Sequence, residues 1–267
     1  MEKRIIALGP KSRKSFMVTL PIDWVKEHKL EIKRVIEMNL VGETIILSQI
    51  KNDPERIVLD ASIVTYSLGR IIQIWYKKGI DEIKIMNITP REMNKMNTLI
   101  EQRCMGFALI SQDKDHCIIK DITKESTEDF NTLLRRVFLI ILQMTEEEDK
   151  ENIENLDKNL NKITAYCHRL LIKKGYHEFQ NIIYYARLCS ELEHFGDSYK
   201  RQFERKKRMT KEEISLIKDL YALFYKFKVE SADQIQKRIH HLMQDEGQLI
   251  TRLNTILGLI YAIKGGK

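Results

Sequence analysis

Hydrophobic and polar residues alternate with a period of two in four short stretches near the start of the chain. The four stretches are residues 5–8, 16–20, 35–40 and 44–48. This period is typical of strands with one buried face. Pro21 has the fixed φ that suits the first turn of a helix, and Trp24 and Val25 follow it at helical spacing. The pattern predicts a strand, strand, helix, strand, strand unit over residues 1–50.

The next segment mixes helical and strand periods. Apolar residues at helical spacing predict a helix over residues 56–78, followed by Gly79, a residue typical of helix C-termini. The elements expected after it are a strand at residues 83–85, a helix from residue 90, and two strands at residues 107–111 and 117–122. This order predicts a small α+β domain over residues 55–122.

From residue 123 onward, apolar residues recur every three or four positions, which predicts helices with one apolar face. The expected helices cover residues 125–147, 149–174, 178–206, 211–228 and 232–262. Gly175 has the position of a C-cap, and Thr210 and Ser231 each begin a capping-box sequence. Such helices predict an antiparallel bundle over residues 123–267. The fold class is therefore a multidomain α+β protein.

Composition and charge narrow the class of protein. The chain has 267 residues, is 43% hydrophobic and carries a formal net charge of +7 at pH 7. Its longest strongly apolar run, residues 137–142, is far too short to cross a bilayer, and the N-terminus has no apolar signal core. The four cysteines are widely spaced and fit buried reduced thiols better than a zinc site or a disulfide framework. These features predict a cytoplasmic protein without membrane insertion.

A basic segment separates the first two predicted strands. Arg4 lies at the first strand, residues 11–15 read Lys-Ser-Arg-Lys-Ser, and the second strand ends in Leu20-Pro21 before the helix with Trp24. This order resembles the AbrB/MazE/SpoVT swapped-hairpin DNA-binding domain. The resemblance implies that two chains interlock their hairpins into one β-barrel and present basic loops to double-stranded DNA. The candidate DNA-binding residues are Arg4, Lys11, Ser12, Arg13, Lys14 and Ser15.

The size and charge of this N-terminal segment support the same interpretation. A unit of about fifty residues has too little apolar material to bury both faces of its strands alone, so we expect a homodimer. Lys and Arg side chains placed against phosphates release counterions and make DNA binding dependent on salt. The alternative for the basic loop is a solvated hairpin turn with no nucleic-acid partner.

The third predicted helix of the bundle contains Leu192-Glu193-His194-Phe195-Gly196-Asp197. This segment resembles the Glu-Arg-hydrophobic-Gly-Asp segment of PhoU, the phosphate-uptake regulator, and residues 157–161 resemble the Asp-x-x-Val-Asn position on the preceding helix of that family. Residues 79–83 and 104–110 are similar to the middle region of archaeal proteins that join an AbrB-type domain to a PhoU-type bundle. The resemblance implies a PhoU-like bundle that senses a phosphate-related ligand or binds a partner protein.

Acidic residues in this segment have the spacing of a metal site. Glu193 and Asp197 lie one helical turn apart, and the PhoU resemblance implies that they and Asp157 bind a divalent or ferric ion. Asn161, an amide in place of a carboxylate, lowers the negative charge there. We therefore expect no cofactor, and instead pairing of Glu193 and Asp197 with nearby cations. The cations considered are Arg187, Lys200 and Arg201.

Two further patterns have simpler interpretations. Glu191 and His194 have the i, i+3 spacing of di-iron bundle proteins, but helical geometry places both away from the apolar stripe, which predicts a surface coincidence. A second basic cluster at the end of a helix consists of Lys200, Arg201 and residues 205–208, and solvated cations there complement the helix terminus. Contact of this cluster with DNA or an acidic partner is the alternative.

Two functional classes follow from these observations. The first is a DNA-binding transcriptional regulator linked to phosphate uptake or phosphate signalling, with the helical domain as sensor or partner-binding module. The second is a PhoU-like signalling adaptor that acts through protein contacts, with the N-terminal domain kept for dimerisation. The sequence contains no Gly-rich phosphate loop, nucleophile elbow or His-Glu-x-x-His motif. We therefore expect that the protein is not an enzyme.

Overall fold

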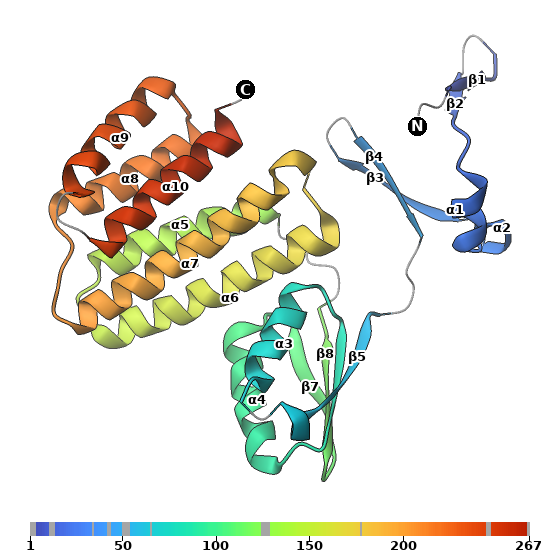
Figure 1. The fold of residues 1–267 in the computed structure, drawn as a ribbon, viewed down its shortest axis with the longest axis horizontal. Coiled ribbons are helices and arrows are strands. Elements are labelled where there is room, and N and C mark those ends of the chain that lie inside the picture. The colour runs from blue at the N-terminus through green and yellow to red at the C-terminus, as the bar shows by residue number, and fades with distance from the viewer. Residues whose placement is uncertain are drawn as a thin grey trace. The chain divides into compact units, whose positions relative to one another are not determined.

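The chain forms two compact units, Met1–Asp53 and Pro54–Lys267 (Figure 1). The computed structural model describes residues 4–10, 14–33, 35–41, 44–49, 54–64, 66–123, 129–176, 178–243 and 247–265. The protein is of the mixed α+β class, with small sheets before a helical C-terminal region. The second unit contains both the α+β segment and the helical segment, and the division predicted between them at residue 122 stays a prediction.

The first unit consists of two antiparallel hairpins and a short helical segment between them. Its elements are β1 (Ile6–Leu8), β2 (Ser15–Met17), α1 (Ile22–Glu27), α2 (Leu30–Lys33), β3 (Ile36–Val41) and β4 (Thr44–Gln49). In the first hairpin Ala7 lies opposite Phe16, and in the second Met38 lies opposite Leu47. The four predicted strands are present, but the second one is shorter than predicted, because β2 ends at Met17 and residues 18–20 are not in a strand. Pro21 is the N-cap of α1. Within one chain, the described residues of this unit form two separate two-stranded sheets and no closed barrel.

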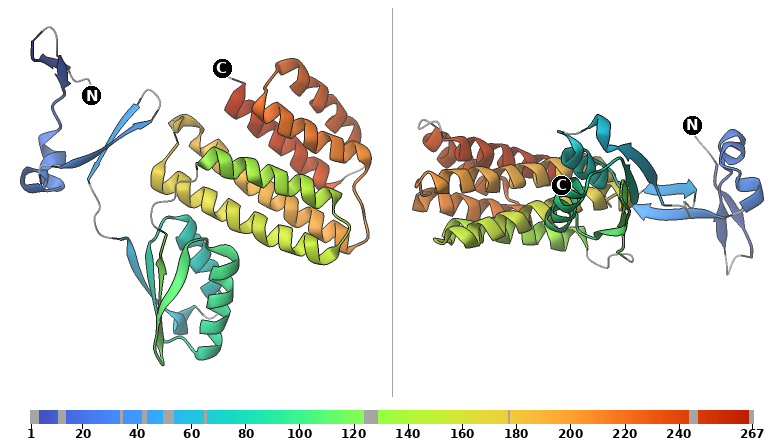
Figure 2. Two further views of the ribbon diagram at one scale, coloured as in Figure 1. Left: turned by 180° about the vertical axis from the view of Figure 1, so that it is seen from behind. Right: turned by 90° about the horizontal axis from the view of Figure 1, so that it is seen from below.

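The second unit begins with a four-stranded sheet in the order β5-β6-β8-β7. Its elements are β5 (Arg56–Asp60), the short 3-10 helix η1 (Ala61–Ile63), α3 (Leu68–Lys77), β6 (Glu82–Met86), α4 (Pro90–Arg103), β7 (Phe107–Gln112) and β8 (His116–Asp121). Strands β5 and β6 are parallel, and the other pairs are antiparallel. Helices α3 and α4 lie on one face of the sheet (Figure 2). The strands and the helix predicted between residues 83 and 122 are confirmed.

The predicted helix over residues 56–78 is wrong in its first half. Residues 56–60 form β5, in which Leu59 is buried and Val58 is exposed, as in a strand with one buried face. Short apolar runs with β-branched residues fit a strand as well as a helix, and parallel pairing with β6 decides the outcome here. The helix begins only at Leu68 and ends at Lys77, and Gly79 adopts a positive φ of 95° just after it, as predicted.

The helical region follows, and its helices α5, α6 and α7 pack side by side (Figure 1). The elements are α5 (Phe130–Glu146), α6 (Lys150–Lys174), the 3-10 helix η2 (Phe179–Asn181), α7 (Ile182–Glu204), α8 (Lys211–Tyr225), α9 (Val229–Leu242) and α10 (Gln248–Lys264). Gly175 ends α6 with a φ of 70°, and the capping box of Thr210 and Glu213 begins α8. Both predicted boundaries are confirmed.

The last predicted helix, residues 232–262, is wrong because the structure has two helices there. Helix α10 begins after Gly247, which is its N-cap and interrupts the long apolar pattern. The predicted cap at Ser231 is also wrong, since α9 already begins at Val229 and its N-cap, Lys228, makes no side-chain cap bond. The apolar faces of α9 and α10 instead pack against each other and against neighbouring helices.

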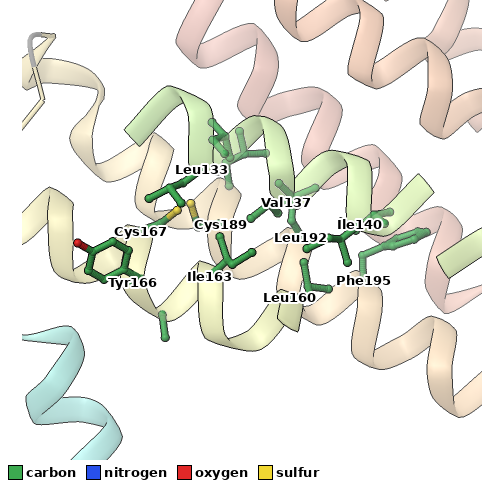
Figure 3. Close-up of a cluster of buried hydrophobic side chains, with 14 of the residues drawn as sticks. Leu133, Val137, Ile140, Leu160, Ile163, Tyr166, Cys167, Cys189, Leu192 and Phe195 are labelled. Atoms are coloured by element: carbon green, nitrogen blue, oxygen red, sulfur yellow. The ribbon is translucent and has the colours of Figure 1, made fainter. Parts of the chain in front are cut away.

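One hydrophobic core runs through the second unit, from the sheet into the helices. Figure 3 shows part of it, where side chains of α5, α6 and α7 such as Val137, Ile163 and Leu192 point toward one another. Gly196 allows α7 to lie close to α6, because a Cβ there would lie 2.2 Å from the Leu160 Cδ2 atom. All four cysteines are buried and free, as predicted. Among the described residues, no helix combines the length and apolar character that a membrane span requires.

Candidate functional site

Three of the six predicted DNA-binding residues are described in the structure. Arg4 and Lys14 are exposed and lie beside the ends of β1 and β2, and the Ser15 hydroxyl donates a hydrogen bond to the Leu8 carbonyl at 3.4 Å. Lys11, Ser12 and Arg13 lie outside the described residues. They belong to the connection between the two paired strands, so the sequence places all of the basic candidates at one hairpin.

The first unit exposes much of its apolar surface. Among its described residues, Leu30 is the one buried hydrophobic side chain, at 5% exposure. Large apolar side chains on both hairpins and on the helical segment are exposed: Ile5, Phe16, Val18, Ile32, Leu40 and Ile45. Exposed large apolar side chains in this number are typical of a surface that a partner covers. The unit therefore lacks a core of its own within one chain.

A cluster of buried polar side chains lies between α6 and α7, where Gly196 brings the helices together. Asp157 is 3% exposed, and its Oδ2 atom lies 2.5 Å from the Lys200 Nζ atom. Burial raises the pKa of Asp157, the neighbouring Asp197 carboxylate raises it further, and Lys200 opposes both effects. The structure therefore brings two of the three predicted metal ligands together, Asp157 and Asp197, with an ammonium group beside them.

This cluster contains polar atoms without hydrogen-bond partners in the described part of the chain. Asn161 is 2% exposed, and neither its amide nitrogen nor its amide oxygen is bonded. Asp157 Oδ1 is also unbonded. Since Asp157 and Asn161 lie one turn apart, they share one face of α6. The great majority of buried polar groups in proteins have a hydrogen-bond partner, so these three atoms require an explanation.

Glu193, the third predicted metal ligand, faces a different neighbour. Its carboxylate lies 3.5 Å from the Lys77 Nζ atom and 3.5 Å from the Thr164 hydroxyl, two turns along α6 from Asp157. It thus pairs with a lysine of α3, which was not among the cations predicted for it. No group of three His, Cys, Asp or Glu residues that could hold a metal ion occurs in the described ranges.

The structure places Glu191 and His194, the two residues with the di-iron spacing, in different surroundings, and only His194 is at the surface. Glu191 is largely covered and pairs with Arg252 of α10 at 3.2 Å, whereas His194 is exposed. The ion pair of Glu191 and Arg252 connects α7 to α10.

In the second basic cluster, residues 205–208 are exposed, and the Arg208 guanidinium lies 3.7 Å from the centre of the Phe203 ring.

Arg169 of α6 is the most connected polar residue that sequence reasoning missed. Its side chain is 2% exposed, and its Nη1 atom donates hydrogen bonds to the carbonyls of Tyr76 and Ile80 at 3.0 and 2.8 Å. Its Nη2 atom lies 2.8 Å from Asp81 Oδ1 and 2.7 Å from Asp121 Oδ2. The one sequence signal was an arginine next to the apolar positions of α6, and that signal does not reveal the partners.

Other cations on α6 bind the α+β segment as well. The Lys162 ammonium donates a hydrogen bond to the Glu101 carbonyl, in the last turn of α4, at 2.8 Å, and Lys173 pairs with Asp81. Lys162 and Arg169, which binds a carbonyl in the last turn of α3, thus place positive charge at two negative helix ends. A polar and ionic face of α6 thus fastens the sheet and its helices to the bundle.

His168, the neighbour of Arg169, gives a pH prediction. Burial lowers the pKa of His168 to about 4, and its Nε2 atom lies 3.1 Å from the Ser190 hydroxyl. Below about pH 6.5, the ordinary pKa of histidine, His168 binds a proton in the unfolded chain but stays neutral in the folded chain. The free energy of unfolding should therefore fall from pH 6.5 toward pH 4, by up to about 1.4 kcal/mol per pH unit from this group.

Urea unfolding of wild type and His168→Gln across that range measures the contribution. The variant should show a shallower fall between pH 6.5 and 4, and His194→Gln, which replaces an exposed histidine of α7, should follow the wild type. Equal pH dependence in all three proteins would show that His168 is protonated as easily in the folded state as in the unfolded state.

No family model, curated protein or solved structure matches this chain.

Proposed function

We propose that the protein is a DNA-binding transcriptional regulator that works as a homodimer, with the helical region as its sensor or partner-binding module. The observation that carries the proposal is the coincidence of two features in the first unit. Its apolar faces are uncovered in one chain, and its first hairpin carries the basic segment around Arg4 and Lys14. A second copy that covers the apolar faces would double the number of basic hairpins and align them toward one duplex.

The family resemblances fit this proposal. An AbrB-type swapped-hairpin barrel closes only when two chains combine, and separate hairpins in a single chain are compatible with such an arrangement. A PhoU-like bundle is compatible with the close approach of α6 and α7 at Gly196 and with the buried Asp157–Lys200 ion pair beside it. On this basis the bundle would respond to phosphate supply and alter the DNA-bound dimer.

DNA binding is tested by its salt dependence. The full chain is titrated at several salt concentrations with a mixed-sequence duplex of about 30 base pairs, roughly three helical turns of DNA. Wild type is compared with Arg13→Ala/Lys14→Ala. The slope of log affinity against log salt should become less negative by about 0.9 for each phosphate that the variant no longer neutralises. Lys95→Ala/Lys158→Ala removes the same charge from exposed positions of α4 and α6 and serves as the control.

The two functional classes predict different results. If the hairpin of a regulator binds phosphates, the slope becomes less negative in the hairpin variant and stays unchanged in the control. An adaptor that uses the first unit for dimerisation alone shows no salt-dependent affinity for the duplex, with all three proteins folded. That second result would reject the proposed transcriptional regulator in favour of the signalling adaptor.

A further inference from the structure

The sheet of the second unit has two edge strands, β7 and β5, and they differ in regularity. Strand β7 carries a β-bulge between Leu109 and Ser111, an irregularity that hinders pairing with a further strand. Strand β5 is regular over five residues and pairs with β6 on one side, and none of the described strands pairs with its other side (Figure 1). The free edge of β5 is therefore the edge at which the sheet can be extended.

The backbone of β5 shows which residues face this free edge. The Glu55 carbonyl accepts a hydrogen bond from the Glu82 amide of β6 at 3.1 Å. Successive residues of a strand direct their N–H and C=O groups to opposite edges, so the backbone groups of Arg56, Val58 and Asp60 point away from β6. The Val58 side chain, at the centre of these three residues, is 65% exposed.

The sequence of β5, Arg-Ile-Val-Leu-Asp, is complementary to itself in the antiparallel direction. If two copies pair about a twofold axis at Val58, each Arg56 lies opposite Asp60 of the second copy, and each Ile57 lies opposite Leu59. Residues directly opposite each other share a face of the sheet, so one face receives two Arg–Asp pairs and the other two apolar pairs. A shift of two residues keeps the backbone groups paired but removes both Arg–Asp pairs, so charge selects this register.

Both charged side chains of β5 are accessible for such pairs. Arg56 is exposed, and its guanidinium lies 3.4 Å from the Glu82 carboxylate on the same face of the sheet. The Asp60 carboxylate accepts hydrogen bonds from the amide and hydroxyl of Ser62 and from the Asn87 side chain, at 2.6 to 3.0 Å. These donors are uncharged, so they hold the carboxylate in place without neutralising it, and a carboxylate has room for about four donors.

We propose that the β5 strands of two copies pair antiparallel through their free edges and join the two sheets of the homodimer into one. This inference rests on the proposed homodimer and adds a second interface to that of the first unit. Two strands of five residues bury too little surface to hold two chains together alone at low micromolar concentration. The first unit ends at Asp53, just before β5, so a dimer of first units raises the effective concentration of one β5 for the other.

Disulfide trapping in the full chain tests the pairing. All four native cysteines are buried, so Val58→Cys adds an exposed thiol at the twofold axis. The Cα atoms of a hydrogen-bonded antiparallel pair lie about 5.5 Å apart, within the range for a disulfide. Oxidation with copper phenanthroline should convert most of Val58→Cys to a covalent dimer on a non-reducing gel. Ile110→Cys adds an exposed thiol to β7 at the other edge and should stay monomeric on that gel.

The register is tested by charge reversal in the Val58→Cys protein. Arg56→Glu places like charges opposite each other at two symmetric positions and should slow cross-linking about fivefold. Lys114→Glu makes the same change at an exposed turn position and should leave the rate unchanged. Circular dichroism verifies that each variant is folded. Equal cross-linking of Val58→Cys and Ile110→Cys, or equal rates with and without Arg56→Glu, would overturn the proposal.

Sedimentation of the wild type distinguishes failure of this inference from failure of the homodimer. A dimeric wild type whose Val58→Cys variant does not cross-link overturns the β5 pairing alone, and the free edge is then available to an extended segment of another protein. A monomeric wild type overturns the homodimer itself and the β5 pairing with it.

Discussion

Replacing Arg169 with Met is expected to lower the free energy of unfolding of the second unit by about 3 to 5 kcal/mol, the range found when one partner of a buried ion pair is removed. Arg169 is 2% exposed and neutralises Asp81 and Asp121, which are themselves largely covered. Its guanidinium also lies 5.1 and 5.2 Å from the ring centres of Tyr76 and Phe107. The substitution removes one donor from each of two carboxylates and two carbonyls, while Asp81 keeps Lys173 and Asp121 keeps the Thr123 hydroxyl.

Urea unfolding followed by circular dichroism measures this effect at neutral pH. Arg136→Met replaces an exposed arginine of α5 and should change the free energy of unfolding by about 0.5 kcal/mol or less. A decrease of similar size in both variants would mean that Arg169 contributes no more than an exposed arginine. Arg169→Lys should recover only part of the stability, because an ammonium cannot reach two carbonyls and two carboxylates in the plane of a guanidinium.

The bonds of Arg169 also bear on cooperativity within the second unit. The α+β segment and the bundle share one hydrophobic core, and α6 adds an ionic face that binds helix ends and carboxylates of the other segment. A buried ion pair is favourable only when its hydrogen-bond geometry is good, so these contacts favour one relative arrangement of the packed layers. If Arg169 sets that arrangement, the second unit of the wild type should unfold in one transition, and that of Arg169→Met should unfold in two, with the sheet and the bundle melting separately.

Much of the local fold was predictable because regular periods and strong terminators coincide. The first two hairpins follow from alternation, and the boundaries of α6 and α8 follow from Gly175 and Thr210. Residues 56–60 were misassigned because a strand whose pairing partner lies more than twenty residues away has no local signature that separates it from a helix. The break at Gly247 was missed because the apolar period continues on both sides of it.

The candidate sites were less predictable, since their chemistry depends on which helices meet. The sequence placed Asp157 opposite the segment of Asp197, and the structure brings these two residues together. It could not show that Lys200 of the same helix pairs with Asp157, or that Glu193 reaches Lys77 of α3. Arg169 was hidden for the same reason, because its four acceptors come from residues 76–121, far away along the chain.

Replacing Phe16 with Asp is expected to convert the protein from a dimer to a monomer. Phe16 is 70% exposed within one chain and lies in β2 opposite Ala7. An exposed phenylalanine contributes little to the stability of a monomer, and its removal costs about 0.5 kcal/mol or less. In a shared core, truncation to Ala already costs about 3 to 5 kcal/mol, and a buried carboxylate costs more.

Sedimentation equilibrium of the full chain at low micromolar concentration distinguishes these cases. Wild type should sediment as a dimer, Phe16→Asp as a monomer, and Ile183→Asp, which alters a similarly exposed residue of α7, as a dimer. A monomeric wild type, or a dimeric Phe16→Asp, would remove the N-terminal interface from the proposed function. Because apolar faces without a cover favour association, the exposed surface of the first unit is itself the reason to expect the dimer.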